Sequence, residues 1–297
     1  MAFTVSPVAP GELTAACRVL FASDSDTLST RNIDPNGLFV AKDERGVIRG
    51  AVLVQVLPGA TGVIVPPRVP GERERIAIED ALVSESCGRL RSQGVKVCQA
   101  FASEKEQPAM LPLTRGGFEH VTQLSNMRRE IDAEADRLPA GCVLDGEFFF
   151  PQLRDTFSQL LLGTFEGTFD CPELNGLRTA DEVFDGYTPE RGRITGPWFL
   201  VKEAGRPIGV VMLDRSGEPG DWEIAYLGLV PEARGRGWGG KLVRFALDQA
   251  ARGGARALRL CVDPRNNPAI RLYRRNGFIE HDRQDVYLAI WPGQTTP

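Results

Sequence analysis

The sequence of 297 residues lacks several features that would assign it to particular classes of protein. No run approaches the roughly 20 apolar residues that cross a bilayer, and the first twenty residues lack the basic segment and long apolar stretch of a secretory leader. Six cysteines are scattered without a C-x-x-C pair, and only His120 and His281 could join them as metal ligands. We therefore expect a cytoplasmic protein that is not bound to a membrane, with reduced thiols and no metal.

A strong net charge is also missing. The formal charge is −4, and a division at residue 146 gives 16 basic against 19 acidic residues, then 19 against 20. This balance argues against a nucleic-acid-binding domain in either half. One segment differs, because 234–275 holds 11 basic residues and only two acidic ones, Asp248 and Asp263. The excess suits a small anionic ligand, although 30 of the 35 basic residues are arginine, so it could also reflect an arginine-rich composition.

The second half has an order of elements typical of a mixed sheet. Apolar residues recur at helical spacing in 151–163, and a long loop rich in glycine, aspartate and proline follows. We expect next a hairpin of strands 198–203 and 207–214, strand 222–230, helix 240–252, strand 257–262, helix 269–276 and a final strand through 286–290. This order indicates an α/β or α+β fold, with a mixed, mostly antiparallel sheet flanked by helices.

The first half repeats this plan at a separation of 160 residues. The matching positions are Phe39 and Phe199, Gly94 and Gly254, and the pairs Gly117-Phe118 and Gly277-Phe278. Three matches in one register, with the same order of elements, favour an internal duplication over chance. We therefore expect two tandem domains, 1–137 and 147–297, joined by a linker at 138–146.

A glycine-rich string, VPEARGRGWGGKL, stands between a predicted strand and a predicted helix. It places Arg234, Gly237 and Gly239 in an R-x-x-G-x-G arrangement. Glycines let the backbone approach a ligand, and the free N–H groups and dipole of a helix start favour phosphate. The string matches neither a Rossmann G-x-G-x-x-G nor a Walker loop, so it predicts a different pyrophosphate site. The alternative is a glycine turn without a ligand.

A second string, NNPAIRLYRRNGF, begins at Asn266 with an N-x-x-A-x-x-L-Y-x-x-x-G-F arrangement, 29 residues after Gly237. Together the two strings resemble the acetyl-CoA signatures of the GNAT family of N-acetyltransferases, over roughly 198–290. The resemblance implies a splayed sheet in which the pantetheine arm lies between neighbouring strands. The tandem plan is similar to that of the mycothiol synthase family, but no residue here identifies the same substrate.

The resemblance also implies a set of cofactor-binding residues. The backbone of Leu229 and Val230 would lie against the pantetheine, the amides from Gly235 to Gly240 would bind the pyrophosphate, and Asn266 would contact the cofactor arm. The full set is Leu229, Val230, Arg234, Gly235, Arg236, Gly237, Trp238, Gly239, Gly240, Lys241, Asn266 and Tyr273. Acetyl-CoA is then the acyl donor.

Two residues are candidates for proton transfer. Tyr273 matches the tyrosine that in many family members protonates the departing thiolate, and a phenol with a pKa near 10 can serve a thiol with a pKa near 8.5. Its alternative role is packing on an amphipathic helix. Glu223 stands where protein-lysine acetylating relatives place their catalytic base, and its alternative is an exposed strand glutamate. Tyr226 could share a water-mediated relay, but strand alternation puts it on the opposite sheet face from Glu223.

The first half departs from the family pattern at the decisive positions. In the 160-residue register Ala77 replaces Gly237, Glu79 replaces Gly239 and Leu113 replaces Tyr273. Carboxylates at the helix start, Glu79 among them, would repel a phosphate. We therefore expect 1–137 to be a degenerate GNAT-like domain and one acyl-CoA to bind per chain, in the second half.

These observations predict an acyl-CoA-dependent N-acyltransferase that moves acetyl from acetyl-CoA to a primary amine of a small molecule or protein, by direct attack in a ternary complex. Its partners would be an acyl-CoA and an amine acceptor, with no nucleic acid. The family often shapes its acceptor pocket with the loop that here holds Asp170, Cys171, Pro172, Asn175 and Arg178, although this loop could be only a connection between helices. The rival is a non-catalytic acyl-CoA-binding or regulatory module, against which Tyr273 and Glu223 argue.

Overall fold

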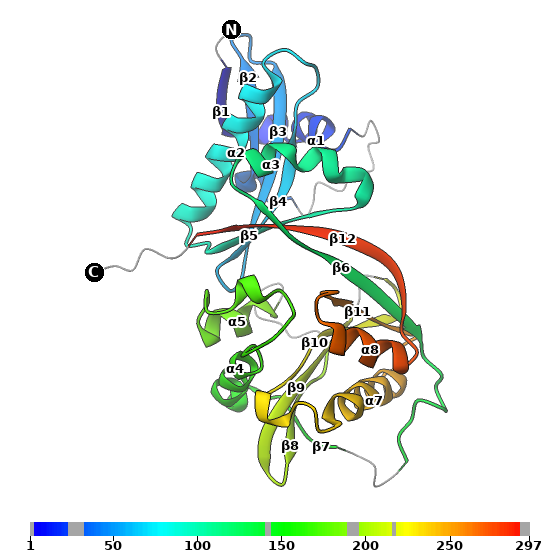
Figure 1. The fold of residues 1–297 in the computed structure, drawn as a ribbon. Coiled ribbons are helices and arrows are strands. Elements are labelled where there is room, and N and C mark those ends of the chain that lie inside the picture. Colours follow the sequence, from blue (N-terminus) through cyan, green and yellow to red (C-terminus); the bar gives the residue numbers. More distant parts are fainter. Residues whose placement is uncertain (1–2, 23–32, 140–143, 189–195, 216–217, 292–297) are drawn as a thin grey trace, which may run out of the picture. The chain divides into compact units, whose positions relative to one another are not determined.

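The computed structural model describes residues 3–22, 33–139, 144–188, 196–215 and 218–291 (Figure 1). The chain divides into two compact units. Unit 1 is Met1–Val121 with Asp285–Pro297, and unit 2 is Thr122–Gln284. Part of the expected linker, 140–143, and with it Cys142, lies outside the described residues. No helix in the described part of the chain is long and apolar enough to span a membrane.

Unit 1 is a mixed sheet with helices on both faces. Its elements are β1 (Phe3–Pro7), η1 (Pro10–Glu12), α1 (Leu13–Phe21), η3 (Pro35–Gly37), β2 (Leu38–Asp43), β3 (Ile48–Leu57), β4 (Thr61–Arg68), α2 (Arg75–Ser92), β5 (Val97–Ala102), η4 (Glu104–Met110), α3 (Leu111–Arg115), the start of β6 (Glu119–Glu130) and the end of β12 (Ile279–Ile290). The strand order is β1-β2-β3-β4-β5-β12. In the described part of these strands, β4 and β5 pair in parallel and the other neighbours pair antiparallel. Helices α2 and α3 share one buried cluster with the sheet, and α1 shares another.

Unit 2 follows the same plan. Its elements are the rest of β6, β7 (Asp145–Phe148), η5 (Pro151–Leu153), α4 (Arg154–Gly163), η6 (Pro172–Leu174), α5 (Ala180–Gly186), β8 (Trp198–Glu203), β9 (Arg206–Arg215), β10 (Asp221–Leu229), η7 (Pro231–Ala233), α7 (Trp238–Arg252), β11 (Ala257–Val262), α8 (Asn267–Arg275) and the start of β12. The strand order is β6-β11-β10-β9-β8-β7, with β10 and β11 parallel and the other pairs antiparallel. The mixed, mostly antiparallel α/β fold predicted from the sequence is confirmed.

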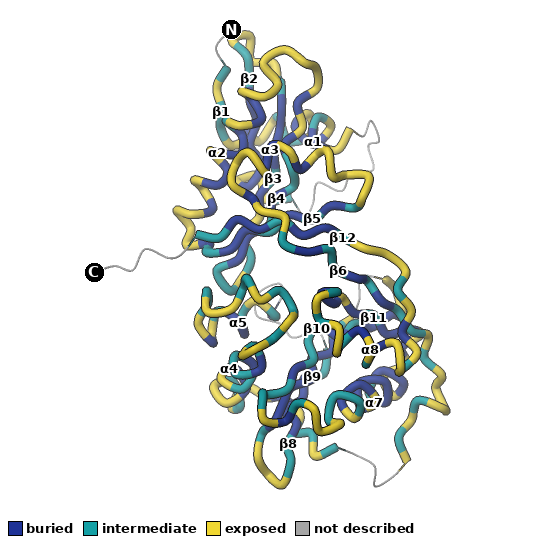
Figure 2. The backbone as a smooth tube through the Cα atoms, in the orientation of Figure 1, coloured by how far each residue is buried: buried dark blue, intermediate teal, exposed yellow. Residues whose placement is uncertain are grey.

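The helices of unit 2 lie on opposite faces of its sheet (Figure 1). Helices α7 and α8 bury apolar side chains against one face, because Leu242, Phe245 and Ala246 recur at helical spacing and all are buried. Helices α4 and α5 cover part of the other face with aromatic residues, among them Phe157, which stacks on Trp198 with ring centroids 5.8 Å apart. Figure 2 shows that buried residues concentrate in the strands and on the inner sides of the helices. Two layers of helices therefore enclose the sheet that carries the candidate site.

The predicted duplication is visible in the element bounds. Strands β8, β11 and β12 begin at 198, 257 and 279, each 160 residues after β2, β5 and β6, which begin at 38, 97 and 119. The last strand of each repeat completes the sheet of the other unit. Residues 125–130 of β6 pair with β11 in unit 2, and residues 285–290 of β12 pair with β5 in unit 1. The repeats expected at 1–137 and 147–297 therefore differ from the compact units by these exchanged strand segments.

Candidate active site

Strands β10 and β11 of unit 2 start side by side and then part. Their parallel pairing joins Asp221–Glu223 to Ala257–Arg259, whereas β10 runs on to Leu229 and β11 to Val262 without a further recorded pair between them. A pocket of about 470 Å³ lies at this opening and is lined by both strands, by the glycine turn and by α8. Unpaired strand edges supply backbone N–H and C=O groups that an amide-bearing chain such as pantetheine can bind. The splayed strands implied by the family resemblance are therefore present.

The glycine turn has the geometry that a phosphate site needs. Gly235 and Gly237 have φ values of +72° and +82°, which an L side chain rarely adopts, and Gly237 is the N-cap of α7. A Cβ at either position would meet nothing within 4 Å, so the space above this backbone is open. The unpaired N–H groups of the first turn of α7 therefore lie beside free space, with the positive end of the helix dipole. Gly235 and Gly239 line the pocket.

Arg234 braces this region through backbone carbonyls. Its guanidinium donates from Nε to Leu229 O at 3.1 Å, from Nη2 to Thr164 O at 2.9 Å and from Nη1 to Gly167 O at 3.3 Å. It thereby ties the end of β10 to the loop after α4, and it lines the pocket. Sequence reasoning placed Arg234 in the site but did not foresee this bracing role.

The predicted cofactor residues divide into those that line the pocket and those that do not. Leu229, Arg234, Gly235, Gly239, Asn266 and Tyr273 line it, whereas Val230, Arg236, Gly237, Trp238, Gly240 and Lys241 do not. The backbone of Val230 is already bonded, since its N–H donates to Ile208 O and its C=O accepts from Ala233 N. The roles of these residues remain predictions.

Two of the residues outside the pocket, Arg236 and Trp238, bond to Glu203 at the end of β8, and Lys241 lies over the Trp238 ring. Arg236 Nη2 and Trp238 Nε1 donate to Glu203 Oε1 at 2.8 and 3.2 Å, and Lys241 Nζ lies 4.1 Å from the centroid of the Trp238 ring. In this structure the side chains of Arg236 and Trp238 are therefore bonded to Glu203 and do not line the pocket.

Tyr273 and Asn266 reach the pocket from α8. Asn266 caps the helix, because its Oδ1 accepts from the N–H of Ala269 at 3.2 Å. Tyr273 is buried and packs edge-on against Phe278, with ring centroids 5.7 Å apart. Burial raises the pKa of the Tyr273 phenol well above its usual value, and the nearby carboxylate of Asp170 raises it further. The phenol is therefore a proton donor at neutral pH.

Glu223 and Tyr226 lie on the same face of the sheet, so the prediction of opposite faces was wrong. The register pairs Glu223 with Asp214, Ile224 with Leu213 and then Tyr226 with Met212, because a bulge lies between Ile224 and Tyr226. In a regular strand, two residues three positions apart point to opposite faces of the sheet. The extra residue of the bulge shifts this alternation by one, so that Glu223 and Tyr226 point to the same face. Burial raises the pKa of Glu223, and Asp214 raises it further against the opposing effect of Arg259. A carboxylate with a raised pKa is a stronger base than an exposed one.

Tyr226 lines the pocket and Glu223 does not. Two residues that were not identified from the sequence shape the pocket around Tyr226. Thr164 Oγ1 lies 2.8 Å from the Tyr226 hydroxyl, within hydrogen-bonding distance. Gly228 leaves room for this contact, since a Cβ there would stand 2.7 Å from the same hydroxyl and 2.8 Å from Thr164 Oγ1. A glycine inside a strand was the available signal, because it often marks a close approach.

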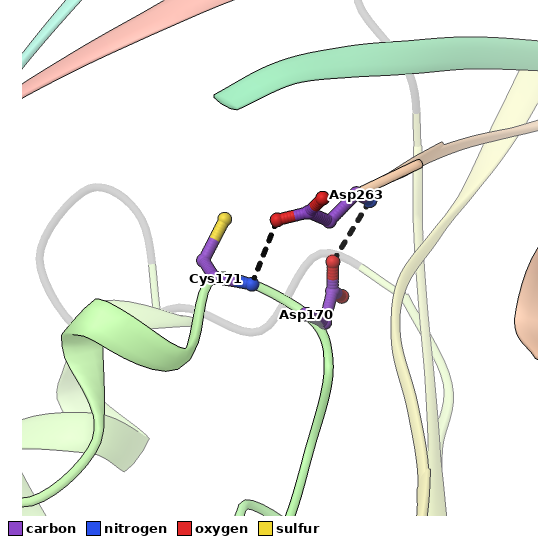
Figure 3. A group of neighbouring side chains, drawn as sticks. All are labelled: Asp170, Cys171 and Asp263. Atoms are coloured by element: carbon purple, nitrogen blue, oxygen red, sulfur yellow. Dashed lines mark hydrogen bonds between the residues drawn. The ribbon is translucent and has the colours of Figure 1, made fainter. Parts of the chain in front are cut away.

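The loop after α4 is fastened to the end of β11 (Figure 3). The N–H of Cys171 donates to Asp263 Oδ2 at 3.2 Å, and the N–H of Asp263 donates to Asp170 Oδ1 at 2.9 Å. Arg265 bridges Asp263 and Glu173 through its guanidinium, at 2.6 and 2.5 Å. These five residues form what we call the loop clamp, which the sequence analysis did not find because its partners are about 90 residues apart.

The loop clamp does not resemble a cation site. The ligand atoms of Asp170, Cys171 and Asp263 lie within 4.8 Å of one another. The carboxylate of Asp263, however, already accepts from Thr122, Cys171 and Arg265, so its charge is paired and its oxygens are occupied. Burial, with Asp170 and Asp263 nearby, raises the pKa of the Cys171 thiol to about 12, which keeps it protonated. The chemistry of this group fits a structural fastening.

The corresponding region of unit 1 differs in a way that the sequence register did not predict. Helix α2 begins at Arg75, three residues before the position that matches the start of α7, so Glu79 lies inside the helix instead of at its start. Its carboxylate is buried and bonded to Arg75 and Arg115 at 2.7 and 2.8 Å. The expected repulsion by Glu79 at the helix start was therefore wrong. Leu113, which replaces Tyr273, is fully buried and has no proton to transfer.

Comparisons with known proteins agree with this geometry. The model of the acetyltransferase (GNAT) family matches residues 164–278. The chain is 27% identical to a mycothiol acetyltransferase of Pseudarthrobacter chlorophenolicus, covering 92% of this chain and 80% of that one. It is 30% identical to a mycothiol acetyltransferase of Thermomonospora curvata, covering 82% and 80%.

Solved structures share the fold over nearly the whole chain. A GCN5-related N-acetyltransferase from Sphaerobacter thermophilus superposes with a TM-score of 0.58 at 19% identity, over 97% of this chain and 95% of that one. A tandem GNAT protein from the clavulanic acid biosynthesis pathway gives a TM-score of 0.55 at 18% identity, over 97% and 98%. The chain therefore belongs to the GNAT family of N-acetyltransferases and has the tandem form of that fold.

Proposed function

We propose that unit 2 binds acetyl-CoA between β10 and β11 and transfers its acetyl group directly to a primary amine, without an acyl-enzyme. The observation that carries the proposal is the position of Tyr273, a protonated phenol in the pocket where the strands part beside the glycine turn. A thioester bound there, with its phosphates at the start of α7, would leave as a thiolate that needs a proton.

The chemistry needs one base and one acid. The amine arrives as an ammonium with a pKa near 10. Glu223 accepts its proton through water and Tyr226, because Tyr226 lines the pocket and Glu223 does not. The nitrogen then attacks the thioester carbonyl, the C–S bond breaks and Tyr273 protonates the sulfur. The second proton that leaves the new amide nitrogen returns to the phenolate of Tyr273, and Glu223 releases its proton to water. Burial raises the pKa of Tyr273, and an apolar site raises the pKa of a thiol in the same way, so the two groups remain matched as donor and acceptor.

Amine-dependent release of free thiol is the direct test. The protein is incubated with acetyl-CoA and a pool of primary amines, and the product is identified by its mass. The relatives named mycothiol acetyltransferase make the unacetylated form of mycothiol one member of that pool. Acetylated amine with stoichiometric thiol release supports the proposal. Tight acetyl-CoA binding without turnover on any amine would support the rival, a non-catalytic acyl-CoA-binding module.

A further inference from the structure

A carboxylate and an exposed aromatic ring stand together at the pocket of unit 2. Phe169 and Asp170 are adjacent in the loop after α4, and both line the pocket that Tyr273 also lines. Phe169 is 59% exposed, which is unusual for a phenylalanine, whereas Asp170 is half-buried. Neither residue has a role in the acyl transfer described above.

Asp170 supplies negative charge to this pocket. It is the one carboxylate among the described residues that line it, while the guanidinium of Arg234, which also lines it, donates to three backbone carbonyls. Burial is the largest cause of the raised pKa values of Tyr273, Tyr226 and Cys261, which come from three different elements, and the charge of Asp170 raises each of them further. Asp170 therefore lies near the point where α8, β10 and β11 meet the loop, and its negative charge extends into the space between them.

We propose that Asp170 and Phe169 form the binding site for the acceptor's ammonium group. The carboxylate of Asp170 receives the charged nitrogen, and the ring of Phe169 covers the adjacent carbon atoms. A half-buried carboxylate pairs more strongly with a cation than an exposed one, and an aromatic face adds a cation–π attraction. The expected acceptor class is a primary ammonium carried on an apolar or aromatic group. This inference rests on the proposed amine acetylation.

The loop clamp gives such a site its rigidity. The carboxylate of Asp170 accepts a hydrogen bond from the N–H of Asp263. The neighbouring residue, Cys171, donates its N–H to the side chain of Asp263, which also forms an ion pair with Arg265. A specificity site needs a carboxylate whose position does not shift when the ligand is absent. Within the described part of the chain the side chain of Asp170 accepts a hydrogen bond from the N–H of Asp263, and its carboxylate has room to accept further bonds.

If Asp170 only fastened the loop, loss of its charge would leave amine binding unchanged. The variant Asp170→Asn therefore distinguishes a structural role from a role in binding the amine. The amide keeps an oxygen that accepts from Asp263, so the fastening survives while the charge is lost. Glu166→Gln is the matched control, because Glu166 is an exposed carboxylate of the same loop that does not line the pocket. Phe169→Leu is a second variant, and the exposure of Phe169 makes it safe for folding.

The test measures acetylation of phenethylamine by the full chain, from thiol release at varied amine and acetyl-CoA. Asp170→Asn should raise KM for phenethylamine about 10- to 100-fold, with kcat and KM for acetyl-CoA within about twofold. Phe169→Leu should raise KM for phenethylamine about two- to fivefold. Glu166→Gln should change nothing.

An unchanged KM for the amine in Asp170→Asn would overturn the proposal. So would a fall in kcat alone, or a loss of acetyl-CoA affinity, since both assign Asp170 to the donor side. If wild-type protein binds acetyl-CoA but does not acetylate phenethylamine, this acceptor class is wrong while the donor site stands. If it does not bind acetyl-CoA, the proposed function itself fails.

Discussion

Replacing Gly237 with aspartate tests the assignment of the glycine turn to the pyrophosphate. Gly237 is the N-cap of α7 and has a φ of +82°. A Cβ there would meet nothing within 4 Å, so a carboxylate fits without a clash and stands beside the first N–H groups of the helix. The variant therefore places a negative charge where the phosphates of acetyl-CoA are expected, with little disturbance of packing.

The size of the effect follows from Coulomb's law. A carboxylate about 5 Å from one phosphate charge, at an effective dielectric constant near 20 to 30, is repelled by about 2 to 3 kcal/mol, so acetyl-CoA affinity should fall about 30- to 160-fold. The left-handed backbone adds a separate cost of about 1–2 kcal/mol to folding stability. That cost lowers the melting temperature by several degrees but leaves the protein folded at 25 °C.

Gly237→Asn is the matched control. Asparagine has nearly the same volume as aspartate and tolerates the same backbone conformation, but it carries no charge. Calorimetric titration with acetyl-CoA should give a Kd close to that of the wild type for Gly237→Asn and a much higher Kd for Gly237→Asp. The difference between the two Kd values should become smaller in high salt. Equal Kd values for the two variants would refute the electrostatic reasoning and remove the pyrophosphate from this turn.

Four further predictions follow from the site and the fold. Tyr273→Phe should lower turnover about 10²- to 10⁴-fold at unchanged acetyl-CoA affinity, and less with a better leaving thiol; unaltered turnover would make Tyr273 a packing residue. Glu223 acts as a base only at a pH above its raised pKa. In a pH–rate profile, Glu223→Gln should therefore lower the rate most between that pKa and the amine pKa near 10, and less at higher pH, where the amine is already neutral; an equal loss of rate at every pH would mean that another group is the base. Titration should find one acetyl-CoA per chain, and in Gly237→Asp no site of wild-type affinity; a second site, or one of full affinity in that variant, would make unit 1 a working domain. A fragment 122–284 should fold by circular dichroism, whereas 147–297 should not; a folded 147–297 would contradict the importance of the exchanged strands.

Local elements were predictable from the sequence because their signals are local. Strands 198–203 and 257–262 have the bounds that their short, mostly apolar runs indicated. The hairpin between β8 and β9 turns at Ala204 and Gly205, whose φ values of +50° and +77° suit the turn residues seen there. The glycine turn before α7 likewise follows from short-range chemistry, although α7 and α8 begin at Trp238 and Asn267, two residues before the expected starts at 240 and 269.

The features that the sequence did not reveal depend on pairings between distant residues. The bulge between Ile224 and Tyr226 depends on the register against β9, and no residue in β10 marks it. The early start of α2 follows a turn through Gly71, for which α7 has no equivalent at that position. The loop clamp and the bracing by Arg234 join segments that only the folded chain brings together.

The exchanged strands explain why a cut at the expected linker should be damaging. Residues 125–130 of β6 form six antiparallel residue pairs with β11, and Met127 among them is fully buried in the core of unit 2. A fragment that starts at 147 loses all six pairs and the burial of Met127, which alone contributes about 1.5–3 kcal/mol.

The same fragment would carry residues 285–290 of β12 without their partner β5, leaving two unpaired strand segments open to aggregation. Those losses are comparable to the stability of a whole domain, about 5–15 kcal/mol. Fragment 122–284 keeps β6 on β11 and omits the strand segment that belongs to unit 1. The duplication thus sets the order of elements along the chain, while strand pairing decides which stretch of chain can fold and carry the acetyl-CoA site.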